Sequence, residues 1–168
     1  MAYLVAPPIA RLALLTAIAL TASAAGAQEL DQSAPGLARS TSFAAFSPEI
    51  GVAVRPLDNT DANIRLQQRF AEVLTRRAVR VQLMPAPVVL NFETETQQVI
   101  NHAKDEAGTV RYVLIATLDD ERTGQRLWQG EARYHAHPSN EEETLDGMVP
   151  ILADQLGRTV RQRSFRLE

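Results

Sequence analysis

Two segments of the chain alternate apolar and polar residues with the period of a β-strand, and a helical pattern lies between them. Residues 50–55 read IGVAVR and residues 79–83 read VRVQL, so each segment turns its larger apolar side chains to one side. Residues 62–78 repeat apolar residues at the spacing of an amphipathic helix. The residues on the apolar side of this helix are Leu66, Phe70, Val73 and Leu74. A strand, a helix and a strand within about 35 residues predict a β-α-β unit or one arm of an α+β sandwich.

The middle of the chain adds a strand and a short helix to this prediction. Residues 85–95 bring Val88, Leu90 and Phe92 to one face, and the prolines at the start of this segment favour a strand at the edge of the sheet. Residues 96–108 repeat apolar residues at helical spacing and end in glycine, so we expect a short helix there.

A hairpin pattern follows. Residues 110–116 are apolar on both faces, which is typical of an interior strand, and residues 125–137 form its partner. In the connecting ERTGQ, the residues before Gly124 suit the centre of a type I turn, and Gly124 suits the positive φ of a bulge. Asp119 and Asp120 stand where the strand must stop. They are consecutive and so point to opposite faces, which favours turn formation over shared acid–base chemistry.

The last part of the chain predicts a closing helix. Its apolar stripe consists of Leu145, Met148, Val149, Leu152, Leu156 and Val160. Because proline clashes inside a long helix, we expect the regular helix to begin near Asp146 with Pro150 in its first turn, or to be kinked at Pro150. Together the patterns predict an α+β fold, with a mixed four- to five-stranded sheet and two or three helices mainly on one face.

The amino-terminal segment has the order of a secretory signal peptide. Arg11 precedes an apolar run of about a dozen residues, and an A-x-A sequence ends at Ala27. The run is short for a membrane span of about 20 residues. We therefore expect a cleavable signal over residues 1–27, a flexible linker over residues 28–47 and a single domain over residues 48–168. The linker prediction rests on a mixture of Gln, Ser, Pro, Gly and Ala without a sustained period.

Charge and cysteine content narrow the class of protein. Removal of residues 1–27 takes away one basic residue, Arg11, and no acidic one, so the net charge moves from −3 to −4. Such a chain is not suited to generic nucleic-acid binding, which needs a basic surface. An exported chain without cysteine has no disulfide bonds and must be held by its core. This combination favours a periplasmic location.

Candidate chemistry is sparse. His135 and His137 would share one face of a strand, and Glu141 follows closely, so the three could contribute to a zinc site. A credible zinc site needs three or four converging ligands, and Pro138 indicates that the strand ends there, so solvated histidines are the favoured interpretation. The chain lacks a glycine-rich phosphate loop, H-E-x-x-H and G-x-S-x-G. We therefore expect no catalytic residue, no bound metal and no cofactor.

Two further features have a structural interpretation and a functional one. Trp128 is the one tryptophan of the chain, and packing beneath a helix is favoured over exposure to a sugar or lipid. The tail GRTVRQRSFRLE carries Arg158, Arg161, Arg163 and Arg166. As the end of a helix, these arginines would stabilise its dipole, and the alternative is contact with an anionic lipid or polymer.

The opening IGVAVRPLDNTDANIRLQQRFAEVLTRR and the later LDDERTGQRLWQGEARY, with a closing helix, resemble small α/β domains of bacterial envelope lipoproteins. Such domains occur in auxiliary components of envelope transport systems and in the amino-terminal part of TolB-type proteins. The resemblance spans residues 48–163 and implies a binding or assembly role in the envelope. It carries over no catalytic residue, and the absence of cysteine means that lipid anchoring does not carry over.

We therefore expect a non-enzymatic, exported protein that binds an envelope protein or another envelope component through the face of the sheet that the helices leave open. Two alternatives stay open: a metal-binding or hydrolytic protein that uses His135, His137 and a glutamate, and a carrier that holds a small apolar ligand between sheet and helices. No nucleic acid and, after signal cleavage, no transmembrane span are expected. The sequence leaves the oligomeric state and the identity of the partner open.

Overall fold

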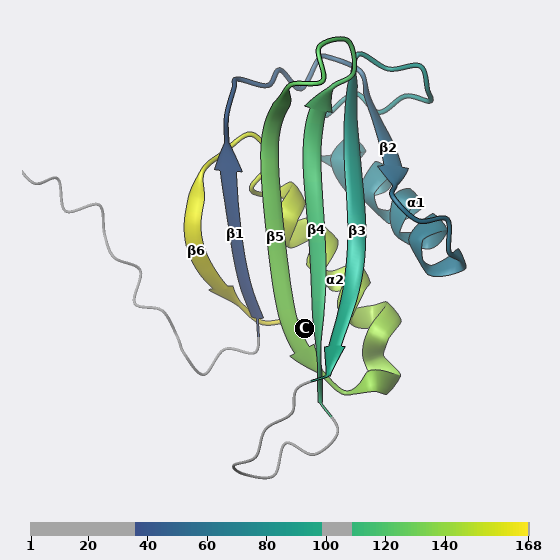
Figure 1. Cartoon of the computed structure of the whole chain (residues 1–168), viewed down its shortest axis with the longest axis vertical. Coiled ribbons are helices and arrows are strands. Elements are labelled where there is room, and N and C mark those ends of the chain that lie inside the picture. The colour runs from purple at the N-terminus through teal and green to yellow at the C-terminus, as the bar shows by residue number, and fades with distance from the viewer. Residues whose placement is uncertain (1–35, 99–108, 168) are drawn as a thin grey trace, which may run out of the picture.

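A single mixed sheet with two α-helices on one of its faces forms the domain (Figure 1). The structure is a computed structural model and describes residues 36–98 and 109–167. The strands are β1 (Gly36–Ser42), β2 (Val52–Pro56), β3 (Val88–Gln98), β4 (Val110–Asp120), β5 (Arg126–Ala136) and β6 (Val160–Phe165). The helices are α1 (Asp61–Arg76) and α2 (Glu141–Ala153), and a 3-10 turn, η1 (Pro138–Asn140), precedes α2.

The strands lie in the order β2-β3-β4-β5-β1-β6. Strands β2 and β3 are parallel, and the other neighbours are antiparallel. The predicted α+β class, mixed sheet and helices on one face are confirmed. The described part of the chain has six strands, where four or five were expected, because β1 and β6 were not predicted while the strand predicted over residues 79–83 is reduced to a bridge.

Helix α1 forms as the sequence predicts. The hydroxyl of Thr60 caps it by accepting a hydrogen bond from the backbone N–H of Asn63 at 3.2 Å, and Asp61 adds a negative charge to the first turn. Its apolar side packs on the sheet, with Phe70 against Phe92 at a ring-centroid distance of 5.0 Å. This contact closes the β2-α1-β3 unit, whose two strands are parallel.

The carboxyl-terminal helix differs from the prediction. Helix α2 begins at Glu141, earlier than Asp146, and includes Pro150 in its interior. It ends at Ala153, and Gly157 then adopts a positive φ of 71°, which turns the chain back into β6. The expected helical residues Leu156 and Val160 are therefore in a turn and a strand. The arginine-rich tail is an edge strand and not the end of a helix.

Strand β1 occupies residues that were expected to be linker. It lies inside the sheet, between β5 and β6, so the folded domain begins before residue 48. Its core-facing residues are small, and Ala38 is 1% exposed. Because Gly36, Ala38 and Ser40 give a weak hydrophobic signal, the strand has little of the alternation that sequence reading detects.

The middle of the chain also differs. Strand β3 lies between β2 and β4 and is not the edge strand that was expected. Pro85 and Pro87 lie before its first residue, so they remove no hydrogen bond from the sheet. Residues 79–83 contribute a single parallel bridge, Val52 with Val81, where a full strand was expected. Strand β3 runs through Gln98, and the rest of the helix expected over residues 96–108 lies outside the described residues.

The β4–β5 hairpin closes as turn chemistry requires. The Asp120 carboxylate accepts a hydrogen bond from the backbone N–H of Thr123 at 2.7 Å, and this bond is the main reason that the pKa of Asp120 lies below its ordinary value. Gly124 has the predicted positive φ, 68°. The bulge lies further into the hairpin, where Leu127 is the extra residue between the pairs that β5 makes with Asp119 and Leu118.

The core lies between the sheet and the helices. Trp128 is 1% exposed and donates its indole N–H to the carbonyl of Arg158 at 3.2 Å, so the prediction of a packed tryptophan is confirmed. Gly130 makes room for it, because a Cβ atom there would lie 2.3 Å from the Trp128 ring and 3.2 Å from Leu152. Among the described residues, no helix has the length and apolar character needed to cross a bilayer.

Both edge strands of the sheet have features that hinder pairing with a strand of another molecule. Strand β6 has six residues, carries Arg161 and Arg163, and has a register shift against β1. At the other edge, the backbone of Val52 in β2 bonds to Arg80 and Gln82 at 2.8 and 2.9 Å. Short length, charge, irregular register and a covering segment are the usual means by which proteins prevent pairing of sheet edges.

Candidate functional site

The helices lie on one face of the sheet and leave the opposite face uncovered (Figure 1). Because Gly130 faces Leu152 of α2, the next residue along β5, Glu131, points to the other side. Glu131 pairs with Arg39 of β1 and with Ile115 of β4, so these residues share its face. We call this side of the sheet the open face.

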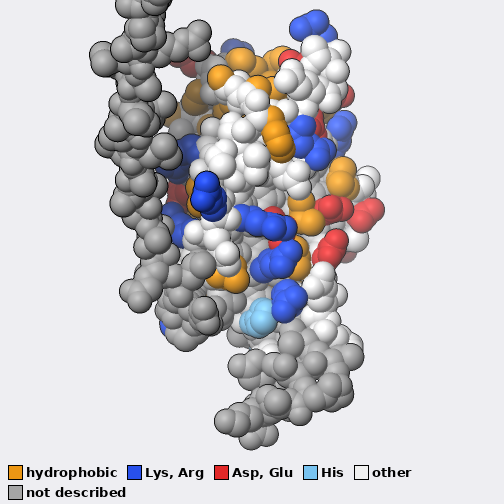
Figure 2. Space-filling view, turned by 60° about the vertical axis from the view of Figure 1, so that its left-hand side comes forward, with side chains coloured by type: hydrophobic (Ala, Val, Ile, Leu, Met, Phe, Trp, Pro, Cys, Tyr) orange, Lys and Arg blue, Asp and Glu red, His pale blue; other side chains and the backbone are white. Residues whose placement is uncertain are grey.

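One half of the open face is basic. Arg39, Arg133 and Arg161 come from β1, β5 and β6 and lie around Glu131. Arg39 donates from Nε to Glu131 at 3.1 Å, and Arg133 also binds the Glu131 carboxylate. Arg161 makes no ion pair with any residue in the described ranges. We call this set of three arginines and one glutamate the basic half-face. In Figure 2, arginine side chains follow one another through the middle of the view, and acidic side chains gather to their right.

Glu131 holds two of these arginines in place. Burial tends to raise the pKa of Glu131, but the hydrogen bonds from Arg39 and Arg133, together with their charges, hold it below its ordinary value of 4.5. The carboxylate is therefore ionised at neutral pH. With one negative and three positive charges, the basic half-face keeps a net positive charge of two.

Two adjoining hollows open on the basic half-face. Their volumes are about 390 and 250 Å³, and both are lined by Arg39, Glu131 and Arg161. The larger one also exposes Thr41 and Gln129. Arginine donors beside hydroxyl and amide groups can bind carboxylates or other oxyanions through several hydrogen bonds at once.

The other half of the open face holds a hydrogen-bonded network around Asp119. Its carboxylate accepts hydrogen bonds from Asn91 and Thr117, both at 2.9 Å, and from Arg126 at 3.1 Å. Arg55 donates to Asn91 at 2.8 Å and so extends the network to β2. Of the two neighbouring aspartates, Asp120 forms the turn as expected, whereas Asp119 joins three strands across the sheet.

The structure does not bring the candidate metal ligands together. His135 lies on β5, where its Nε2 is 3.0 Å from Nε of Arg111. His137 instead caps η1, and its Nδ1 accepts a hydrogen bond from the backbone N–H of Ser139 at 3.3 Å. Glu141 begins α2. Within residues 36–98 and 109–167, no group of three or more His, Asp or Glu side chains has an arrangement that could hold a metal ion.

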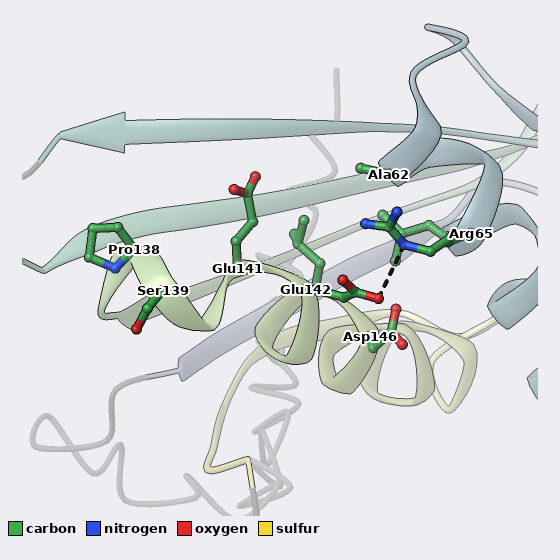
Figure 3. Close-up of a pocket in the computed structure, with 9 residues that line it drawn as sticks. Ala62, Arg65, Pro138, Ser139, Glu141, Glu142 and Asp146 are labelled. Carbon is green, nitrogen blue, oxygen red and sulfur yellow. Dashed lines mark ion pairs between the residues drawn. The ribbon is translucent and has the colours of Figure 1, made fainter.

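A separate hollow of about 340 Å³ lies between the amino-terminal ends of α1 and α2 (Figure 3). Arg65 of α1 forms an ion pair with Glu142 at 3.2 Å, and Asp146 lies one turn further along α2. Burial is the main reason that the pKa of Asp146 lies above its ordinary value of 3.8, although nearby Arg69 acts to lower it. This charged lining does not suit a small apolar ligand, so this hollow does not favour the carrier hypothesis.

Sequence reading missed the basic half-face because its parts are far apart in the chain. Arg39 fell in the expected linker and Arg161 in the expected helix, and only the fold places them beside Arg133. One signal was available: in GLARSTS, small residues alternate with Leu37, Arg39 and Thr41, which is the pattern of a strand with a tightly packed inner side.

Comparison with known proteins gives similarity of fold but not of sequence. No family model matches the chain, and no curated protein matches it. Among solved structures, the PelC dodecamer from Paraburkholderia phytofirmans is 18% identical, with a TM-score of 0.55, over 74% of this chain and 99% of that one. A PDZ domain protein from Parabacteroides distasonis is 13% identical, with a TM-score of 0.54, over 77% of this chain and 37% of that one.

Lipoprotein GNA1162 from Neisseria meningitidis is a more distant structural match, 16% identical with a TM-score of 0.41, over 64% of this chain and 97% of that one. At these identities the comparisons concern the fold. The resemblance that the sequence suggested is confirmed at the level of the fold, which this chain shares with PelC at low sequence identity.

Proposed function

We propose that this chain is a non-enzymatic, exported assembly protein of the bacterial envelope, and that its basic half-face binds an acidic protein partner. The observation that carries the proposal is the gathering of Arg39, Arg133 and Arg161 around a single carboxylate. Glu131 orients two of the arginines, and Arg161 has no ion pair among the described residues. A partner carboxylate would supply the missing negative charge.

The fold is consistent with this role. The PelC chain that resembles it is described as a dodecamer, so a similar arrangement of sheet and helices occurs in a protein that assembles with other chains. Because both edge strands hinder pairing with another strand, contact with a partner through the open face is favoured. The signal-like residues 1–27 support export to the periplasm, where the partner would be another envelope protein.

The test is site-specific cross-linking of the full chain in living cells. A photoreactive residue replaces Thr41, which lines the larger hollow on the basic half-face, or Thr75, which is exposed on α1. We expect a discrete cross-linked envelope protein from position 41 and none from position 75. Because charged pairs at interfaces govern association, the variant Arg39→Glu/Arg133→Glu/Arg161→Glu should reduce the position-41 product by about tenfold or more.

The control variant reverses charges elsewhere. Arg65→Glu/Arg76→Glu changes two exposed arginines of α1 and should leave the product unchanged. An undiminished product in the triple variant, with both variants folded by circular dichroism, would contradict the proposal.

A further inference from the structure

The open face carries a second charged region, which lies on strand β3. Phe92 packs against Phe70 of α1, so the next residue, Glu93, points to the open face. Glu95 follows on the same side of the strand and accepts a hydrogen bond from Gln97 at 3.1 Å. Glu93 is partly exposed and Glu95 is exposed, and neither forms an ion pair with a residue in the described ranges. We call Glu93 and Glu95 the acidic strip.

The register of the sheet places the acidic strip level with the basic half-face. Two rows of paired residues cross the open face from β3 through β4 and β5 to β1: Glu93–Ile115–Glu131–Arg39 and Glu95–Val113–Arg133–Leu37. Each row has a carboxylate at its β3 end and an arginine on β5 or β1. The residues of β4 between them carry no charge. Opposite charges are therefore separated on one face, at the same height along the strands.

The other charges of the open face do not cancel this separation. Asp119 binds Arg126 at 3.1 Å, and Glu121 lies 3.8 Å from Arg55, so the end of the face near the hairpin is balanced. Arg111 lies on β4, one row beyond the two that carry the acidic strip. The basic half-face keeps its net positive charge of two, and the acidic strip carries two negative charges.

A two-fold axis that runs along the strands between β4 and β5 matches these charges. The axis lies at the middle of the order β2-β3-β4-β5-β1-β6, so it lays β3 of each copy on β1 of the other (Figure 1). Because this rotation keeps the height along the strand, Glu93 of each copy faces Arg39 of the other. Glu95 then lies one strand spacing, about 4.8 Å, to the side of Arg133. Sheets packed face to face are about 10 Å apart, a gap that long charged side chains fill.

We propose that two copies of this chain associate through their open faces, with the acidic strip of each copy on the basic half-face of the other. Such a contact is isologous, so the same match of charges is made twice. The hollows beside Arg39 and Arg161 receive the incoming carboxylates among arginine donors. The inference rests on the proposed function in using the same basic half-face, and it makes the dimer the form in which this surface is covered until the acidic partner binds.

Two variants of opposite charge test this contact. Glu93→Arg/Glu95→Arg makes both charged regions of the open face positive, and Arg39→Glu/Arg133→Glu/Arg161→Glu makes both negative. We expect sedimentation equilibrium to give a dimer for the purified unchanged chain. Each variant alone should need about tenfold or more higher concentration to dimerise, because like charges then face each other. An equimolar mixture of the two variants should dimerise again, since every contact in the mixed dimer joins an arginine and a glutamate.

The control is Arg65→Glu/Arg76→Glu on α1, which should dimerise as the unchanged chain does. With all variants folded by circular dichroism, the inference is overturned by a monomeric unchanged chain, by variants that dimerise as well as the unchanged chain, or by a mixture that stays monomeric.

The same variants separate this inference from the proposed function. Glu93→Arg/Glu95→Arg leaves the basic half-face intact, so the cross-link from position 41 to an envelope protein should persist in cells. A monomeric chain that still gives this cross-link contradicts the dimer alone. A dimer whose mixed variants associate as expected, without any cross-linked product other than the chain itself, contradicts the proposed partner alone.

Discussion

Glu131 shows how a single side chain can organise a surface. It is 12% exposed and binds both Arg39 and Arg133, which are much more exposed. The two guanidinium groups stabilise the ionised carboxylate, so its pKa in the folded chain is depressed. The ion pairs therefore contribute stability above the ordinary pKa of 4.5, and this contribution is lost as the pH falls through the folded-state pKa.

Replacement of Glu131 by glutamine tests this linkage. We expect Glu131→Gln to lower the free energy of unfolding at pH 7 by about 1 kcal/mol or less, because the arginines are solvent-exposed and the interaction is screened. The difference from the unchanged chain should be smaller at pH 3 than at pH 7, because the contribution declines once the pH is below 4.5. Urea unfolding at both pH values measures it, with Glu49→Gln, an exposed acid in a loop, as control. A difference that is the same at both pH values would contradict the role assigned to the carboxylate.

At the scale of elements, β1 contributes more to the core of the sheet than its small side chains indicate. It is an interior strand, with β5 on one side and β6 on the other. Its inner side chains are small because the rings of Tyr134 and Phe165 occupy the space above Gly36, where a Cβ atom would lie 2.7 and 2.8 Å from them. The strand thus combines low hydrophobicity with full incorporation into the core.

Placing an aspartate on either face of β1, one face at a time, tests whether residues 36–42 form a core strand or a linker. Ala38→Asp places an unpaired carboxylate at a position that is 1% exposed, and we expect a loss of several kcal/mol, enough to unfold a domain of ordinary stability. Thr41→Asp changes an exposed residue of the same strand and should cost less than about 1 kcal/mol. Thermal unfolding followed by circular dichroism gives both values. Equal melting temperatures for the two variants would mean that β1 is not part of the folded sheet.

At the scale of the whole molecule, the domain presents two different surfaces. The open face is polar, with its positive charge gathered at β1, β5 and β6, whereas the loop between α1 and β3 exposes Leu83 at 90%.

The proposed export can be measured directly. We expect the chain to be cleaved after Ala27, because small residues at the A-x-A positions fit the signal-cleavage pattern. Intact-mass analysis of protein from the periplasmic fraction should give a chain that begins at Gln28. Ala27→Arg should block cleavage and leave the precursor. Recovery of the uncleaved chain as the main form of the unchanged protein would contradict the assignment.

The sequence allowed prediction of the elements whose packing is strongly hydrophobic. Phe70 on α1 belonged to a clear helical period, the continuous apolar run of β4 indicated an interior strand, and Gly124 marked the hairpin. Strand β1 was missed because alanine and serine can fill an inner face as well as leucine when large rings lie opposite. Strand β6 was read as helix because the stripe from Leu145 continues to Val160 in the sequence, although the backbone reverses at Gly157. The basic half-face could not be predicted without these two strands.

The position of β1 also sets the order of events in folding. Its residues meet partners that are far away in the sequence: Arg39 and Glu131 are 92 residues apart, and Ser40 and Arg158 are 118 apart. Strands β5 and β6 cannot be joined until β1 lies between them, so the sheet closes only after nearly the whole domain has been synthesised. Contacts of such long range slow the formation of the native state. We therefore expect β1 to lack its β6 partner until synthesis has passed residue 165, so this edge of the sheet is the last to form.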